Sequence, residues 1–331
     1  MNPPTDLNDV TSSPNLPESN GLFRMLVTLF GLIWLINAGF QFSTWVWHPD
    51  HGGSSRLLHV FTAATTYAPA WLRPCLLWIT DVVRGTGPHL VALAMVTIAL
   101  LLGLSLISRI GVRAACWLGI AYSVACWVVL CALGYPYGGG QTDPGVFPAY
   151  VIAFVFVLSV LPEISRQPQA SRPQAALWTT GRVLFGLLWG FDAVLKWEPY
   201  FLTHFLDQLT PASQGQPAWI AAYIGLVVAI VTAVGPLAVA VVVALVETVF
   251  AVSLLTGRWM RVFVPLGFLY SLAVWTTAEG WGGPYTSAGT GIRGNVLGNV
   301  LIYALIYLFL LVPLLRRAPA WRPVGARARP V

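Results

Sequence analysis

Long stretches of apolar residues dominate the chain, and short polar segments separate them. A helix needs about 20 predominantly apolar residues to cross the roughly 30 Å hydrocarbon core of a bilayer. Stretches near that length are predicted to be transmembrane helices. Eight such stretches cover residues 22–46, 88–107, 114–133, 147–162, 178–197, 236–256, 261–279 and 297–315.

Two further stretches are ambiguous. Residues 70–84 contain Arg73, Asp81 and Arg84, which makes a complete crossing unfavourable. Residues 218–234 are apolar throughout but short, and a proline lies on each side of them. Hydrophobicity alone therefore leaves the number of spans open.

The basic residues decide between the two counts. With eight spans and a cytoplasmic N-terminus, 13 of the 18 Lys and Arg residues fall on the cytoplasmic side, as the positive-inside rule favours. Counting the two ambiguous stretches as spans would move four arginines to the outside. These are Arg109, Arg113, Arg166 and Arg172. We therefore predict interfacial or half-inserted helices at 70–84 and 218–234 on the outer face, and both termini in the cytoplasm.

Composition agrees with the membrane prediction. Apolar residues make up 57% of the chain and charged residues only 9%, whereas about a quarter of the residues in a soluble protein are charged. This excludes a soluble enzyme, a nucleic-acid-binding domain and a disordered protein. The expected partner is membrane lipid and not nucleic acid.

The chain contains an internal duplication. At a shift of 148 residues, many Trp, Pro, Gly and Tyr positions coincide, and at a shift of 155 the first helix of each half also aligns. A shared preference for Leu and Val would not keep these residue types in register. Matching pairs include Pro69 and Pro217, Gly87 and Gly235, Arg113 and Arg261, Gly119 and Gly267, Tyr122 and Tyr270, Trp127 and Trp275, and Trp34 and Trp189.

The duplication predicts a domain layout. Each half contains an even number of spans, so the halves are parallel repeats about an axis along the membrane normal. We predict an all-α integral membrane protein in which two four-helix repeats each carry an outer interfacial helix. The segments are a disordered cytoplasmic tail at 1–20, the first repeat at 21–163, a cytoplasmic linker at 164–177, the second repeat at 178–315, and a basic cytoplasmic tail at 316–331.

The two halves differ in their ionisable residues. The candidate catalytic residues Asp192, Lys196, Glu247 and Glu279 all belong to the second half. Their counterparts in the first half are Asn37, Gln41, Ala99 and Cys131. The simplest interpretation is one working site in the second half, with the first half kept as a packing partner.

The positions of the four residues suggest how such a site is built. Asp192 and Lys196 are four residues apart, so they share a helix face and can pair near the outer end of their span. Glu247 lies near the middle of its span, where a carboxylate is a functional hypothesis by default, with a raised pKa or a partner such as Lys196. Glu279 closes its span at the outer end. The alternative is purely structural: an Asp192–Lys196 salt bridge, an interfacial Glu279 and a satisfied Glu247.

Aromatic residues lie beside this group. Trp275 is one turn before Glu279, and the Gly/Pro-rich turn that follows contains Trp281 and Tyr285. These three are candidates for contact with a cofactor at the mouth of a pocket. The outer-loop residues His48 and His51 are spaced for a metal, but no Cys or helical frame supports them, so no metal site is predicted.

Three stretches of the second half resemble the DoxX/DoxD family of four-helix membrane proteins. Residues 182–199 look like the family's first helix, residues 247–258 look like its second helix, and Trp275 with the turn after Glu279 looks like the exit of its third. The chain is then similar to a tandem duplication of that family. The resemblance implies a bacterial or archaeal plasma-membrane subunit of a thiosulfate:quinone oxidoreductase type, with quinone as cofactor and a soluble or membrane redox partner.

Three functions remain open at this point. The first is a quinone-linked oxidoreductase subunit, with Lys196 attracting an anionic sulfur substrate such as thiosulfate at the outer face and Glu247 and Glu279 handling protons. The second is a non-catalytic anchor or assembly subunit of a redox complex. The third is a transporter of a small solute or ion beside Asp192, Lys196 and Glu247.

Overall fold

A computed structural model describes residues 18–43, 56–134, 142–164, 172–282 and 297–316. These residues form α-helices joined by turns and short 3-10 segments, and the described part of the chain contains no strand. The predicted all-helical class is confirmed for this part.

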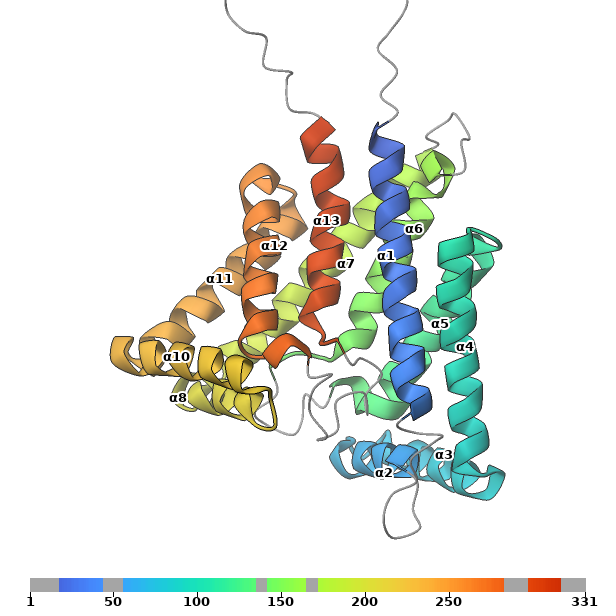
Figure 1. Cartoon of the computed structure of the whole chain (residues 1–331), viewed down its shortest axis with the longest axis horizontal. Coiled ribbons are helices and arrows are strands. Elements are labelled where there is room, and N and C mark those ends of the chain that lie inside the picture. Colours follow the sequence, from blue (N-terminus) through green and yellow to red (C-terminus); the bar gives the residue numbers. More distant parts are fainter. Residues whose placement is uncertain (1–17, 44–55, 135–141, 165–171, 283–296, 317–331) are drawn as a thin grey trace, which may run out of the picture.

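The longer helices form an up-and-down bundle (Figure 1). The start of α1 and the end of α13 lie at the same end of the bundle, which we call the termini end. The opposite end is called the outer end, after the orientation that the sequence analysis predicts. The bundle helices are α1 (Glu18–Gln41), α4 (Pro88–Ser108), α5 (Val112–Cys131), α6 (Val146–Ile164), α7 (Arg172–Lys196), α11 (Pro236–Thr256), α12 (Met260–Thr276) and α13 (Val300–Arg316).

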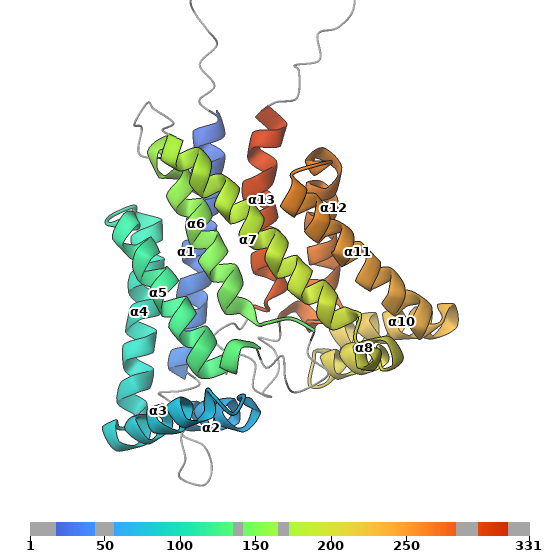
Figure 2. The same ribbon diagram turned by 180° about the vertical axis from the view of Figure 1, so that it is seen from behind.

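Shorter helices lie across the bundle at its outer end. Both views show α2, α3, α8 and α10 running roughly at right angles to the bundle helices (Figures 1 and 2). The stretches predicted to be interfacial correspond to α3 and α10, which have this crosswise orientation. Helices α2, α8 and α9 were not predicted, because the sequence analysis searched for spans and these helices are too short to be one. The bounds are α2 (Arg56–Tyr67), α3 (Arg73–Thr86), α8 (Pro199–Thr203), α9 (Leu206–Leu209) and α10 (Ala218–Val234).

Four helices are long and apolar enough to cross a membrane by length and composition. They are Gly21–Gln41, Pro88–Ser108, Val112–Gly134 and Pro236–Thr256. Shorter apolar helices cover Val146–Pro162, Ala218–Val234, Met260–Thr276 and Val300–Leu315. Together these features describe a helical membrane protein.

Some helix ends differ from the sequence prediction. Helix α12 ends at Thr276, so Glu279 lies beyond the helix rather than within its last turn. Helix α7 begins at Arg172, so part of the segment 164–177 is helical and not a linker. Helix α1 begins at Glu18, inside the predicted N-terminal tail.

The two halves share local backbone features at matched positions. Gly87 has φ 102° and ψ 111° where α3 meets α4, and Gly235 has φ 107° and ψ 113° where α10 meets α11. These left-handed values favour glycine, which has no Cβ to clash. Leu133 and Trp281 have nearly the same left-handed angles in the turns that follow α5 and α12.

Each half packs an equivalent aromatic cluster. The first contains Phe30, Trp34, Tyr122, Tyr150 and Phe154, with ring centroids 4.7–6.3 Å apart. The second lies around Trp189. It consists of Phe185, Trp189, Phe250, Tyr270, Tyr303 and Tyr307. The apolar cores are therefore nearly the same.

Aromatic contacts also join the two halves. Phe23 of α1 and Phe156 of α6 contact Phe309 of α13, with ring centroids 6.3 and 6.0 Å away. Trp178 of α7 packs edge-on against Phe156 at 4.9 Å. The halves thus share one continuous hydrophobic core.

Candidate functional site

A cavity of about 350 Å³ lies near the outer end of the second half. Helices α7, α11, α12 and α13 enclose it together with α8, α9 and the inward face of α10. Part of the lining is apolar, with Val227 and Val231 from α10, Val239 and Val243 from α11, and Phe205. Ionisable side chains line another part of the cavity. A cavity of this size with few convergent polar groups has the character of a small-molecule site.

An ion pair lies in the polar part of the cavity lining. The Lys196 Nζ atom is 2.8 Å from Glu247 Oε2, and both side chains are largely buried. Tyr270 donates a hydrogen bond of 2.7 Å to Glu247 Oε1, and Lys196 donates one of 2.9 Å to the carbonyl oxygen of Thr142. Each end of the pair therefore has a second polar partner, as a buried pair needs if the loss of hydration is to be offset.

Asp192 lies beside this pair but is not its partner. Its side chain is buried, lines the cavity and is close enough to Lys196 and Tyr303 to interact electrostatically with both. The ion pair in the structure joins Lys196 to Glu247, which was one of the two pairings left open by the sequence, and not to Asp192, which the shared helix face suggested. Helical spacing brings two residues to one face, but the longer lysine side chain reaches across to α11.

Glu279 has contacts typical of a helix cap. Its carboxylate accepts hydrogen bonds from the backbone N–H of Asn299 at 2.7 Å and of Val300 at 3.1 Å, where α13 begins. Gly298 has φ 89° and leaves no room for a Cβ beside the carboxylate. Burial and the neighbouring Asp143 raise the pKa of Glu279 to about 8, although the two N–H groups favour its charged form. The same carboxylate also lines the cavity.

The first half contributes Thr142 and Asp143 to the cavity. Asp143 accepts hydrogen bonds from the Gly145 N–H at 2.7 Å and from Asn299 Nδ2 at 3.0 Å. Sequence analysis missed this carboxylate, since it is in a loop of the half that lacks the buried charges. The neighbouring Thr142 has Thr290 as its counterpart at the shift of 148 residues, but such a match between the halves does not indicate contact between them. The first half is thus more than a packing partner.

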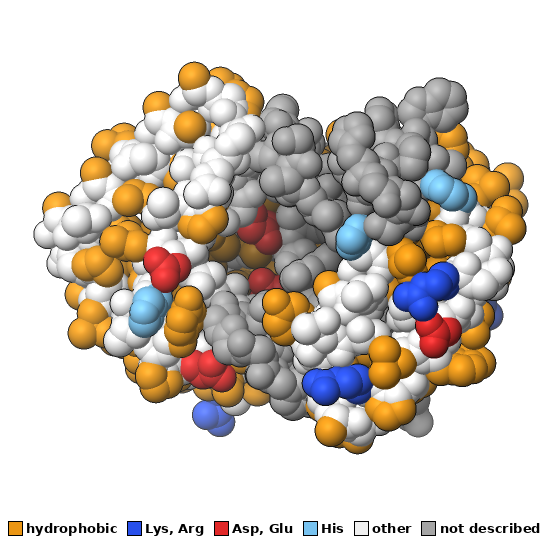
Figure 3. All heavy atoms as spheres, turned by 90° about the horizontal axis from the view of Figure 1, so that it is seen from below, with side chains coloured by type: hydrophobic (Ala, Val, Ile, Leu, Met, Phe, Trp, Pro, Cys, Tyr) orange, Lys and Arg blue, Asp and Glu red, His pale blue; other side chains and the backbone are white. Residues whose placement is uncertain are grey.

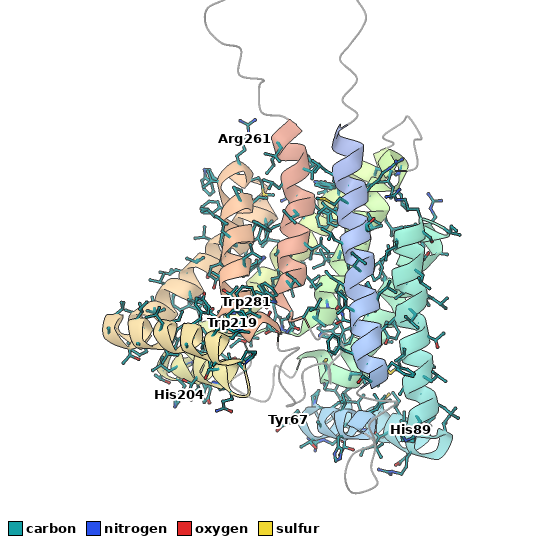
Figure 4. The ribbon with its side chains drawn as sticks, in the orientation of Figure 1. Tyr67, His89, His204, Trp219, Arg261 and Trp281 are labelled. Atoms are coloured by element: carbon teal, nitrogen blue, oxygen red, sulfur yellow. The ribbon has the colours of Figure 1, made fainter. Side chains whose placement is uncertain are left out.

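Two of the candidate aromatic residues lie next to the site without lining the cavity. Trp275 donates a hydrogen bond of 2.7 Å to the Leu297 carbonyl, and its ring is 5.1 Å from that of Trp281. Trp281 also packs against Trp219 of α10, at the end of the molecule opposite to Arg261 (Figure 4). These contacts hold the turn before α13 in position. Tyr285, the third candidate, lies outside the described residues.

The histidines give no metal site in the described part of the chain, where no group of three or more metal-ligating residues occurs. His204 stacks on Tyr200, with ring centroids 4.5 Å apart. His48 and His51 lie outside the described residues.

In the first half, the positions equivalent to Asp192, Lys196 and Glu247 carry uncharged residues. Asn37, at the position of Asp192, donates a hydrogen bond of 2.7 Å to the Tyr150 hydroxyl. Gln41 replaces Lys196 and is also buried, while the buried Ala99 replaces Glu247. The same helical frame therefore carries buried charge in one half and neutral polar groups in the other.

Comparison of the chain with models of known families, with curated proteins and with solved structures gave no match.

Proposed function

We propose that this chain is the membrane subunit of a quinone-linked oxidoreductase, similar to the DoxX/DoxD family, and that quinone binds in the cavity of the second half. In this proposal the chain crosses a bacterial or archaeal plasma membrane eight times, with both termini in the cytoplasm. The up-and-down bundle, its four long apolar helices and the crosswise outer helices support this topology.

One observation carries the proposal: the cavity combines hydrogen-bonding side chains with apolar lining residues. A quinone has two carbonyl oxygens that accept hydrogen bonds and an apolar tail. The Lys196 ammonium lines the cavity and has three N–H donors, of which Glu247 and the Thr142 carbonyl take two. The Tyr270 hydroxyl donates its only hydrogen to Glu247 and would turn to the quinone when the head binds, while the valines of α10 and α11 give the same cavity apolar surface. These residues fit a quinone head and the beginning of its tail.

Reduction of a quinone to a quinol consumes two electrons and two protons. The residues of this chain would orient the head and hold protons close to it. Asp192 is buried on the cavity wall, and its Oδ1 atom has no hydrogen-bond partner among the described residues. A carboxyl group in that setting is able to hold and pass on a proton.

The electrons would come from a soluble or membrane partner that oxidises the donor substrate. Among the described residues, four carboxyl groups and one ammonium line the cavity, and Glu247 already neutralises the ammonium of Lys196. This charge balance is unfavourable for an anion. In our proposal thiosulfate, or a related anionic sulfur compound, is therefore oxidised on the partner, and only the quinone enters the cavity.

The test is binding of a short-chain ubiquinone to the purified protein in nanodiscs. We expect Tyr270→Phe to weaken binding by roughly tenfold, since a hydrogen bond lost from a buried polar site contributes about 1–1.5 kcal/mol. The matched control is Tyr122→Phe, which makes the same change at the equivalent position of the first half. It should leave the affinity within about twofold of the wild type.

A second variant tests the ion pair without leaving one charge unpaired. The double change Lys196→Gln with Glu247→Ala copies the residues of the first half, and it should abolish thiosulfate-driven quinone reduction in membranes. Equal affinity in the two tyrosine variants would contradict the proposal, as would a wild-type protein that binds no quinone. Solute uptake by proteoliposomes without a redox partner would instead favour a transporter.

A further inference from the structure

The cavity has different surroundings on its two sides along the bundle axis. Towards the termini end, an aromatic layer follows directly on the ionisable residues. Phe185 and Trp189 lie two turns and one turn from Asp192 on α7, Phe250 lies one turn from Glu247 on α11, and Tyr307 lies one turn from Tyr303 on α13. All four side chains of the layer are buried and in ring contact.

Beyond that layer, the four helices around the cavity carry no carboxyl, imidazole or ammonium group to relay protons. On the stretches of α7, α11, α12 and α13 between the layer and the termini end, no Asp, Glu, His or Lys occurs. Arg182 lies there, and its guanidinium donates hydrogen bonds to the carbonyls of Leu254 and Leu255. A guanidinium stays protonated in proteins, so it cannot pass a proton by releasing its own.

Towards the outer end, two carboxyl groups continue from the cavity. Asp143 and Glu279 both line it, and Asn299 joins them by donating its Nδ2–H to Asp143 and its backbone N–H to Glu279. Seen from the outer end, the surface is hollowed near the middle of the molecule, and acidic side chains are visible in the hollow (Figure 3).

We propose that the cavity exchanges protons only with the aqueous phase at the outer end, and that Asp143 and Glu279 relay these protons. The inference rests on the proposed function, because the protons in question are the two consumed by each quinone reduced. The ionisable groups that face the relay are Asp192 and Lys196 on α7, Glu247 on α11, Tyr270 on α12 and Tyr303 on α13. Electrons still arrive from the redox partner, so the reaction takes up protons on one side of the membrane.

Accessibility tests the one-sided opening without any need for activity. Val243→Cys places a thiol on the cavity wall, and Leu254→Cys places one a full turn past Phe250 on the same helix, towards the termini end. Both changes are made in a Cys75→Ser background, because Cys75 is exposed. The probe is a membrane-impermeant, positively charged methanethiosulfonate, applied to right-side-out and to inverted membrane vesicles.

We expect Val243→Cys to react at least ten times faster in right-side-out vesicles, and the buried Leu254→Cys to stay unmodified in both. A negatively charged methanethiosulfonate should react more slowly than the positive reagent, since carboxyl groups surround the thiol. Equal or faster modification of Val243→Cys in inverted vesicles would overturn the proposal, and so would no modification from either side.

The relay is tested by quinone reduction in vesicles whose inner and outer pH are set separately. Reduction by the wild type should depend on the pH at the outer end alone. Asp143→Asn with Glu279→Gln should slow it about tenfold above pH 8, while Asp81→Asn should not. Asp81 is a suitable control because it is an exposed outer-end carboxylate that pairs with Arg84.

The failures of the two proposals are distinguishable. If Val243→Cys is labelled from one side only but the wild type reduces no quinone, the proposed function is wrong and the one-sided opening of the cavity is still supported. Quinone reduction that follows the pH at the termini end would overturn the proton route while leaving the oxidoreductase function intact.

Discussion

The two halves of this protein are the same frame with different polar residues inside it. Both bury a tryptophan among phenylalanine and tyrosine rings, and both turn from a crosswise helix into a bundle helix at a glycine with nearly identical backbone angles. Where the second half has Lys196 paired with Glu247, the first half has Gln41 and Ala99. Folding of the frame therefore does not require buried charge, and the charges of the second half need another explanation. A site that handles protons and a polar ligand supplies one.

Among the variants that test this comparison, changes to the Lys196–Glu247 ion pair should have the largest effect on stability. Lys196→Gln alone leaves the buried Glu247 carboxylate without its partner, which is expected to destabilise the protein by about 3–5 kcal/mol. Adding Glu247→Ala recreates the pair of residues in the first half, and it should restore most of that loss. Thermal unfolding of the wild type, the two single variants and the double variant in one detergent measures the coupling energy between Lys196 and Glu247. A double variant as unstable as Lys196→Gln alone would mean that the second half does not tolerate the residues of the first half.

Glu279 should give a smaller effect that depends on pH. Its pKa is raised from 4.5 to about 8 in the folded protein. The folded state thus holds the proton more tightly than the unfolded chain, so this contribution to stability is complete below about pH 4.5 and is lost as the pH rises through 8. Between pH 5 and 9, the unfolding temperature of the wild type should fall relative to that of Glu279→Gln, which does not titrate. A difference that is constant with pH, or that changes in the opposite direction, would contradict this.

Removal of single tyrosine hydroxyls from the two aromatic clusters should have the smallest effects on stability. Tyr150→Phe in the first half removes the acceptor for the buried Asn37 amide, so we expect a loss of about 1–2 kcal/mol. Tyr307→Phe should change stability by less than about 1 kcal/mol. The Tyr307 hydroxyl has no hydrogen-bond partner among the described residues, and a phenylalanine, Phe154, already fills the equivalent place in the first half. Denaturation midpoints of the two variants measure both losses of stability. A larger loss for Tyr307→Phe than for Tyr150→Phe would contradict this prediction.

Much of the arrangement was predictable because the bilayer simplifies the problem. Apolar runs such as 88–107 and 236–256 predicted helices whose bounds the structure nearly reproduces. The distribution of basic residues predicted that 70–84 and 218–234 are not full spans, and the corresponding helices α3 and α10 lie crosswise to the bundle. The ends of the helices were less predictable. Thr276 ends α12 three residues before Glu279, because that carboxylate caps the next helix instead of continuing its own.

The candidate site was predictable in its members but not in its contacts. Comparison of the repeats singled out Asp192, Lys196, Glu247 and Glu279, and all four line one cavity. Sequence reasoning named both Asp192 and Glu247 as partners for Lys196 and could not choose between them, because helical spacing compares residues only within one helix. Asp143 was missed for a similar reason. A loop carboxylate of one half gives no periodic signal that points to the other half.

The sequence by itself determined the helical class, the repeated frame and the half that carries the charge, because these depend on hydrophobic length, on the side on which basic residues lie and on residue identity at matched positions. Only the tertiary structure decided that Lys196 pairs with Glu247, that Glu279 caps α13, and that Asp143 crosses from the first half to the cavity. These contacts join residues that are 51, 21 and more than 100 positions apart in the sequence. Such pairs meet only through the packing of helices and loops, which short-range spacing does not encode.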